Sequence, residues 1–82
     1  MMRVKVLGAG CANCKNTVAL VQAVAREKGV AIEVEKVEDL RDIVAYGIMS
    51  TPGVVINDAV VHAGGVPSRE KVEGWMVGAA TS

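Results

Sequence analysis

The sequence predicts a single α/β domain over residues 1–82, in which helices flank a central four-stranded mixed sheet. Segments with the two-residue periodicity of strands alternate along the chain with segments of helical periodicity. A helix that joins two strands makes them parallel, whereas the Asn57-Asp58 pair is a hairpin signal and adds an antiparallel pair. The predicted order of elements is therefore β-α-β-α-β-β-α.

The first predicted strand runs from Arg3 to Leu7, because Val4 and Val6 fall on one face of an alternating pattern. The residues that follow include two glycines, which end the strand. A long helix is expected from Cys11 to about Lys28, where another glycine stops it. Residues at the spacing i, i+4, i+7 and i+11 line one face of this helix: Cys14, Val18, Val21 and Ala25.

The second predicted strand, Val30 to Val37, is followed by a short helix. Ile32, Val34 and, less cleanly, Lys36 share one face of the strand, and its charged residues are interpreted as a solvated surface. Asp39 is a suitable cap for the helix. The helix carries three apolar residues at i, i+3 and i+4, namely Leu40, Ile43 and Val44, and it ends at a glycine.

The last third of the chain predicts a hairpin and a closing helix. The third strand, Val54 to Ile56, is entered through Pro52, and the Asn57-Asp58 turn leads to a returning strand from Ala59 to Ala63. Ser68 is placed to cap the final helix. The apolar face of that helix comprises Val72, Trp75, Met76 and Ala79.

Composition excludes several classes of partner. Nine basic residues balance nine acidic ones, so the chain has no net charge that would attract a nucleic-acid backbone or an anionic membrane. The only aromatic residues are Tyr46 and Trp75, which leaves no stacking platform for single-stranded nucleic acid. We therefore expect neither a nucleic acid nor a membrane as partner.

The hydropathy pattern and the N-terminal sequence predict a cytoplasmic protein. No apolar stretch approaches the length of a membrane span, and the first residues are too few and too charged for a signal peptide. A lasting structural disulfide is not expected in the reducing cytoplasm. The two cysteines are therefore interpreted as chemical groups rather than as structural cross-links.

Cys11 and Cys14 are three residues apart at the start of the first predicted helix. Such a pair can exchange electrons, hold a soft metal ion, or pack as two small apolar residues. The helix N-terminus favours negative charge and lowers a thiol pKa, which suits Cys11 as the attacking group. Cys14 belongs to the apolar face, where burial is expected to raise its pKa, so it would resolve the mixed disulfide.

These features together resemble the thioredoxin fold, in particular the small thioredoxin-like proteins called redox-active disulfide proteins. The resemblance covers nearly the whole chain. It implies that Pro52 is a cis proline facing the dithiol and that Thr51 offers its backbone to an extended substrate. It also implies that the Gly64-Gly65 turn lets a partner approach the cysteines.

The sequence departs from the usual thioredoxin motif at several positions. Gly10 stands where thioredoxin has Trp before the first cysteine, and Ala12-Asn13 replaces Gly-Pro between the two cysteines. No acidic residue lies in the strand Arg3 to Leu7 to match the buried carboxylate of thioredoxin, and Lys5 is the ionisable group near that place. The redox potential is left open across the range of about −270 to −120 mV known for such dithiols.

Two other hypotheses use the same segment. Small metallochaperone domains place the same cysteine motif after a first strand, where thiolates bind copper(I) or zinc. Their order, β-α-β-β-α-β, differs from the predicted one, and zinc would need further ligands, for which only His62 is available. A dinucleotide-binding loop is disfavoured because Asn13 replaces the third glycine of its motif.

The sequence as a whole favours a cytoplasmic thiol–disulfide oxidoreductase, or electron-transfer protein, that uses the Cys11-Cys14 couple. It needs no metal and no bound cofactor. The expected partners are a protein disulfide substrate and a protein reductase, and the protein is expected to be a monomer. Binding of copper or zinc by the same two cysteines is the alternative.

Overall fold

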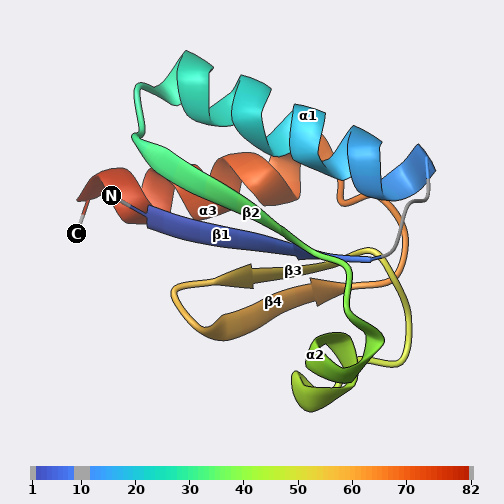
Figure 1. The fold of residues 1–82 in the computed structure, drawn as a ribbon. Helices are drawn as coiled ribbons and strands as arrows, with labels where there is room; N and C mark the ends of the chain where they lie inside the picture. The colour runs from blue at the N-terminus through green and yellow to red at the C-terminus, as the bar shows by residue number, and fades with distance from the viewer. Residues whose placement is uncertain (1, 9–11, 82) are drawn as a thin grey trace.

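The computed structural model describes residues 2–8 and 12–81, with side chains described up to Val77. The predicted order of strands and helices is confirmed (Figure 1). The elements are β1 (Met2–Leu7), α1 (Ala12–Lys28), β2 (Ile32–Val37), α2 (Leu40–Ala45), β3 (Gly53–Ile56), β4 (Ala59–Ala63) and α3 (Arg69–Thr81).

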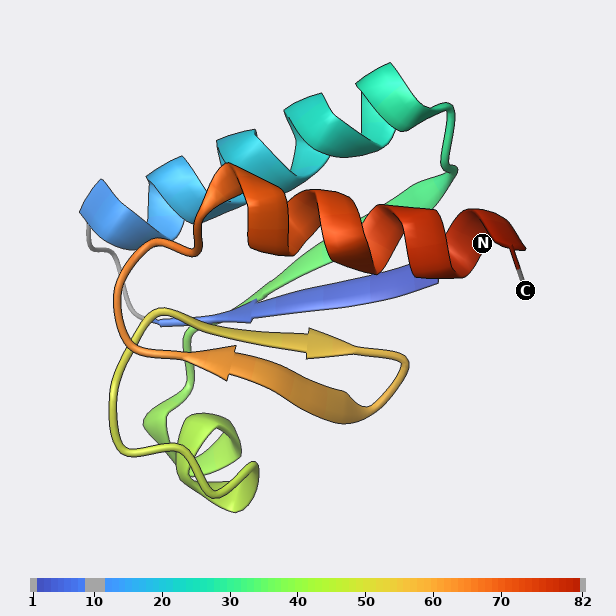
Figure 2. The same ribbon diagram turned by 180° about the vertical axis from the view of Figure 1, so that it is seen from behind.

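The four strands form one mixed sheet in the order β2-β1-β3-β4. β1 pairs in parallel with β2 and antiparallel with β3, and β3 pairs antiparallel with β4. Helices α1 and α3 cover one face of the sheet, and α2 lies against the other (Figures 1 and 2). β1 is thus an interior strand, and its carboxyl end lies near the start of α1.

The position of α2 between β2 and β3 distinguishes this fold from the metallochaperone order. In the described part of the chain the second strand leads into a helix rather than into a hairpin partner. The last element, α3, is also a helix. The structure therefore has the topology that was predicted and not that of the alternative.

Each face of the sheet carries its own apolar core, because side chains alternate along the central strands. The larger core joins α1 and α3 to the sheet; its fully buried members include Val4, Val21, Val24, Val54, Val72 and Met76. The smaller core lies under α2 and consists of Leu7, Ile43, Ile48 and Val55.

The buried stripe of α1 is wider than the predicted one. Thr17 and Val24 are fully buried, whereas Val18, which was assigned to the stripe, is only partly buried. The Thr17 hydroxyl donates to the Asn13 carbonyl oxygen at 2.7 Å, so this polar group is satisfied inside the helix. Thr17 can therefore face the apolar core without leaving a buried hydroxyl unpaired.

Of the three apolar residues at i, i+3 and i+4 in α2, only one is buried. Ile43 is 5% exposed, but Leu40 is 71% and Val44 is 62% exposed. The helix is six residues long, and Ile43 is its one buried residue and joins the core beneath it.

The ends of the helices and the hairpin follow the predicted local chemistry. The Asp39 carboxylate accepts from the Arg41 backbone N–H at 2.8 Å, and the Ser68 hydroxyl accepts from the Lys71 N–H at 3.2 Å. Asn57 and Asp58 both have positive φ, at 48° and 70°, as a two-residue turn between twisted strands requires.

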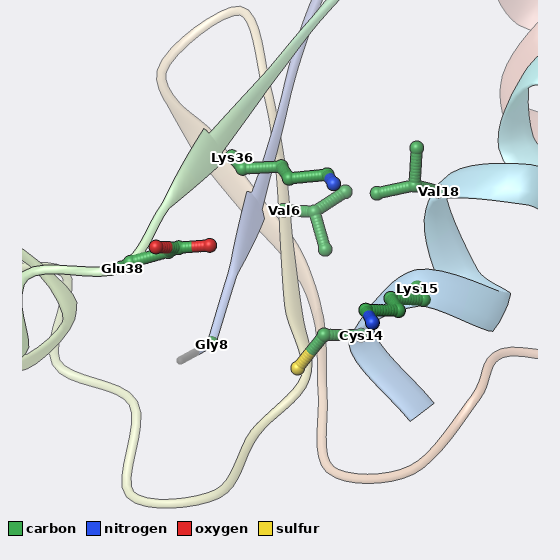
Figure 3. A pocket seen from close by; sticks show the side chains of 7 residues that line it. All are labelled: Val6, Gly8, Cys14, Lys15, Val18, Lys36 and Glu38. Carbon is green, nitrogen blue, oxygen red and sulfur yellow. The ribbon is translucent and has the colours of Figure 1, made fainter. Parts of the chain in front are cut away.

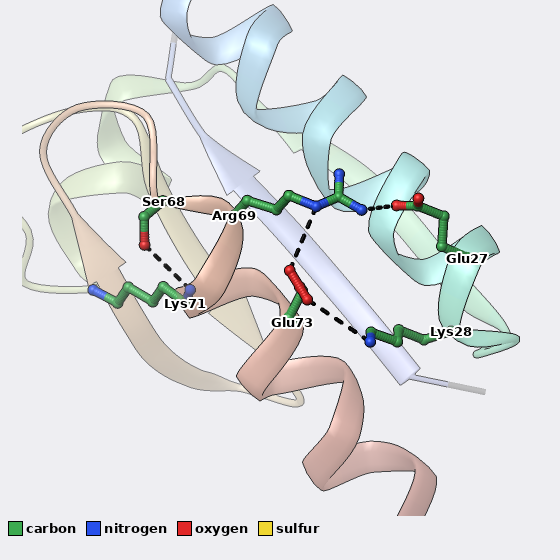
Figure 4. Close-up of polar contacts among 6 residues, drawn as sticks. All are labelled: Glu27, Lys28, Ser68, Arg69, Lys71 and Glu73. Atoms are coloured by element: carbon green, nitrogen blue, oxygen red, sulfur yellow. Dashed lines mark hydrogen bonds and ion pairs between the residues drawn. The ribbon is translucent and has the colours of Figure 1, made fainter.

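Surface ion pairs connect α1 to α3. Arg69 bonds to Glu27 of α1, and Glu73 accepts from both Arg69 and Lys28 (Figure 4). These side chains are between a third and just over half exposed, so each pair contributes only about 0–1 kcal/mol.

Among the helices of residues 12–81, none combines the length and apolar character that crossing a bilayer demands.

The two leucines at opposite extremes of burial provide a test of this packing. Leu7→Ala should destabilise the protein by about 2–5 kcal/mol, because it empties part of the core beneath α2. Leu40→Ala removes the same atoms from an exposed position and should change the free energy of unfolding by less than about 0.5 kcal/mol. Urea denaturation followed by circular dichroism measures both, and equal losses for the two variants would contradict the packing described.

Candidate functional site

Cys14 lies in the first turn of α1 and faces the sheet. It is 7% exposed, and its sulfur is disulfide-bonded. No free cysteine occurs in the part of the chain that the structure describes. Cys11, which was predicted to be the exposed member of the pair at the helix start, lies outside the described residues.

Gly8, at the end of β1, lies directly against the Cys14 sulfur. A Cβ at Gly8 would overlap Cys14 Sγ and would lie 3.5 Å from the Thr51 Cβ. The Gly8 N–H donates to the Val37 carbonyl at 2.9 Å, which fixes this backbone to the end of β2. Because glycine has no side chain, the end of β1, the first turn of α1 and the segment before β3 can meet at one point.

The segment before β3 presents Thr51 and buries Pro52. The Thr51–Pro52 peptide bond is cis, Pro52 is fully buried, and the Thr51 side chain is exposed. Within residues 2–8 and 12–81, the Thr51 backbone makes no hydrogen bond. Its N–H and carbonyl are therefore available to another chain, at a position beside Gly8 and Cys14.

The predicted glycine turn lies next to this segment. The Gly64 N–H donates to the Pro52 carbonyl at 3.0 Å, and a Cβ at Gly64 would lie 3.3 Å from the Ser50 Cβ. Gly64 and Gly65 both have positive φ, at 83° and 70°, which side chains rarely adopt. The structure thus brings together three of the residues predicted for substrate binding, Thr51, Pro52 and Gly64. Gly65 continues the same turn.

A small pocket opens beside Cys14 (Figure 3). Seven residues from β1, α1 and the end of β2 line it: Val6, Gly8, Cys14, Lys15, Val18, Lys36 and Glu38. The parallel register that pairs Val6 with Lys36 brings the end of β2 alongside the end of β1. Figure 3 shows the Lys36 side chain extending from the sheet towards α1. Two cations and one carboxylate therefore surround the approach to Cys14.

The ionisable groups near the cysteine differ from those expected. Lys36 is exposed, as its interpretation as part of a solvated face implies, but it also lines the Cys14 pocket together with Glu38. Lys36 shares a strand face with Ile32 and Val34, which pack against the core under α1, and this pattern was the available signal. Glu38 follows the strand, and only the register of the sheet places it here.

Lys5, by contrast, belongs to the opposite face of the sheet. Its ammonium donates to the Tyr46 hydroxyl at 2.9 Å and lies 5.6 Å from the centre of the Tyr46 ring. The hydrogen bond with Tyr46 raises the pKa of Lys5 above its ordinary value of 10.5. Lys5 therefore does not occupy the place beside Cys14 that the sequence comparison with thioredoxin suggested.

His62, the one additional ligand considered for zinc, has both ring nitrogens in hydrogen bonds. Nε2 lies 2.9 Å from the Gly65 carbonyl oxygen, and Nδ1 lies 2.8 Å from the Lys71 ammonium. The residue belongs to β4, is half-buried, and contacts Trp75 of α3 through its ring. Both ring nitrogens are thus engaged with residues of the turn and of α3.

The close approach at Gly8 predicts opposite effects for two glycine substitutions. Gly8→Ala should destabilise the protein by about 1–3 kcal/mol, since its methyl group overlaps the Cys14 sulfur. Gly74→Ala, within α3, meets no atom within 4 Å and should stabilise the protein by about 0.5–1 kcal/mol through helix propensity. Thermal denaturation of the two variants compares them directly. A Gly8→Ala variant as stable as the wild-type protein would show that the contact between Gly8 and the Cys14 sulfur is not tight.

Comparisons with known proteins agree with this arrangement. Residues 2–77 match the family described as thioredoxin domain. A thioredoxin from Methanocaldococcus jannaschii is 33% identical over 73 residues, which cover 89% of this chain and 84% of the relative. A thioredoxin from Methanothermobacter thermautotrophicus is 29% identical over 73 residues, covering 89% and 95%. A probable thioredoxin from the same organism is 35% identical over 65 residues, covering 76% and 75%. With its fold and the extent of these matches, the chain belongs to the thioredoxin domain family.

Proposed function

We propose that this protein cycles Cys11 and Cys14 between a dithiol and an intramolecular disulfide, and so transfers two electrons to or from a partner protein. Membership of the thioredoxin domain family supports a role as a thiol–disulfide oxidoreductase. The observation that carries the specific proposal is the buried, disulfide-bonded sulfur of Cys14 beside Gly8 and Thr51. Cys11 is the only other cysteine of the sequence and stands three residues before it.

The reaction begins with the thiolate of Cys11. It attacks one sulfur of a partner disulfide, that S–S bond breaks, and the second partner sulfur leaves as a thiolate and takes up a proton. Cys14 then loses its proton to solvent and attacks the Cys11 sulfur, which releases the first partner sulfur. The partner has gained two electrons, and this protein now holds the Cys11–Cys14 disulfide. A protein reductase restores the dithiol by the reverse exchange.

Burial decides which cysteine acts second. At 7% exposure, the Cys14 side chain offers little surface to a disulfide on another protein, whereas an attack within the mixed disulfide needs no access from outside. Its pocket still connects it to Lys15, Lys36 and Glu38, which gives the thiol proton a polar route to solvent. Cys14 is thus suited to resolving the mixed disulfide.

The partner is proposed to bind as an extended segment along Thr51. The Thr51 backbone carries an available donor and acceptor, and β-type pairing uses both groups. The Gly64 turn lies on the other side of Pro52 and adds no side chain that would block the approach. We place this exchange in the reducing cytoplasm, with a monomer as the working unit and without metal or cofactor.

Cysteine variants test the order of events. In thiol–disulfide buffers of graded poise, the wild-type protein should lose both thiols in a single two-electron transition. Cys14→Ser should accumulate a mixed disulfide with a protein substrate, since the resolving thiol is gone, and non-reducing electrophoresis should show the adduct. The matched variant Cys11→Ser should form no such adduct. An adduct on Cys11→Ser alone, or two independent one-thiol transitions, would contradict the proposed cycle.

A further inference from the structure

We propose that His62 is a positioning residue for polypeptide substrates, because it fixes the Gly64-Gly65 turn through the Gly65 carbonyl. The inference rests on the proposed oxidoreductase function and extends it to substrate class. His62 itself contacts no reacting atom. Its role is to hold backbone that a bound polypeptide meets and that a small disulfide does not.

The hydrogen bonds of His62 define one tautomer. A carbonyl oxygen can only accept, so Nε2, at 2.9 Å from the Gly65 oxygen, carries the ring hydrogen. An ammonium can only donate, so Nδ1, at 2.8 Å from the Lys71 Nζ, accepts. Lys71 therefore holds the imidazole in the state that donates to the turn.

The ring is also held by packing against α3. Its centroid lies 6.3 Å from that of Trp75, with the planes inclined by 61° in an edge-to-face contact. Lys71 and Trp75 are one helical turn apart, and the neighbouring Val72 and Met76 are fully buried in the main core. The imidazole thus connects the turn to a helix whose neighbouring face is buried in the main core.

Without such a connection the double glycine would be a highly adaptable piece of backbone next to Pro52. Glycine loses more conformational freedom on ordering than any other residue. The Gly64 side of the turn is tied to Pro52 by the 3.0 Å hydrogen bond, and the Gly65 side is tied to His62. Ordering the turn before the partner arrives lowers the entropic cost of binding an extended segment beside Thr51.

Two amide substitutions distinguish the contribution of Nε2 from that of Nδ1. The amide of His62→Gln reaches the position of Nε2 and can still donate to Gly65, whereas that of His62→Asn reaches only the position of Nδ1. The substrates are insulin, as a polypeptide disulfide, and bis(hydroxyethyl) disulfide, as a small one, with dithiothreitol regenerating the dithiol. His62→Phe serves as a second variant that keeps the ring contact with Trp75 but has no donor.

With insulin, His62→Asn and His62→Phe should raise KM about 3- to 10-fold at unchanged kcat, the factor expected for one lost hydrogen bond. His62→Gln should stay within about twofold of wild type, and no variant should alter the rate with bis(hydroxyethyl) disulfide. An insulin KM unchanged in both donor-free variants, or an equal loss with the two substrates, would overturn the inference. Wild-type protein that reduces neither substrate would instead contradict the proposed function, and the inference with it.

Discussion

The contact between the end of β1 and the first turn of α1 determines the rest of the site. Gly8 allows the Cys14 sulfur to lie where any side chain would place its Cβ, and Thr51 approaches the same point from the segment before β3. The end of β1, the first turn of α1 and the distant segment before β3 meet there because one residue has no side chain. The helix α1 can then bury Cys14 while the helix begins near the carboxyl end of β1.

The two-sided sheet explains why these parts keep their positions. α1 and α3 pack on one face through a core of fully buried valines and Met76, and α2 is held on the other face by Leu7 and its neighbours. β1 contributes Val4 to the larger core and Leu7 to the smaller one, so packing on both faces of the sheet holds the strand in place. The same strand pairs with β2 on one side and with β3 on the other. The end of β2 places Lys36 and Glu38 at the site, and the segment before β3 places Thr51 and Pro52 there.

Local sequence signals predicted the elements well, and long-range packing accounts for what they missed. The Asn57-Asp58 turn and the Ser68 cap depend on a few adjacent residues, and both occur as predicted. The exposure of Leu40 and the burial of Thr17 depend on how closely a helix meets the sheet, which periodicity does not measure. Lys36 and Glu38 reach the Cys14 pocket only through the register of two parallel strands.

We propose that packing of α1 against Gly8 protects Cys14 and leaves the attack on a partner disulfide to Cys11. Alkylation of the reduced protein with iodoacetamide, followed by mass mapping of the two cysteines over time, tests it most directly. Cys11 should be modified first, and Cys14 should react slowly until guanidinium unfolds the chain, when the two rates should become similar. Faster labelling of Cys14, or equal rates in the folded protein, would contradict the account.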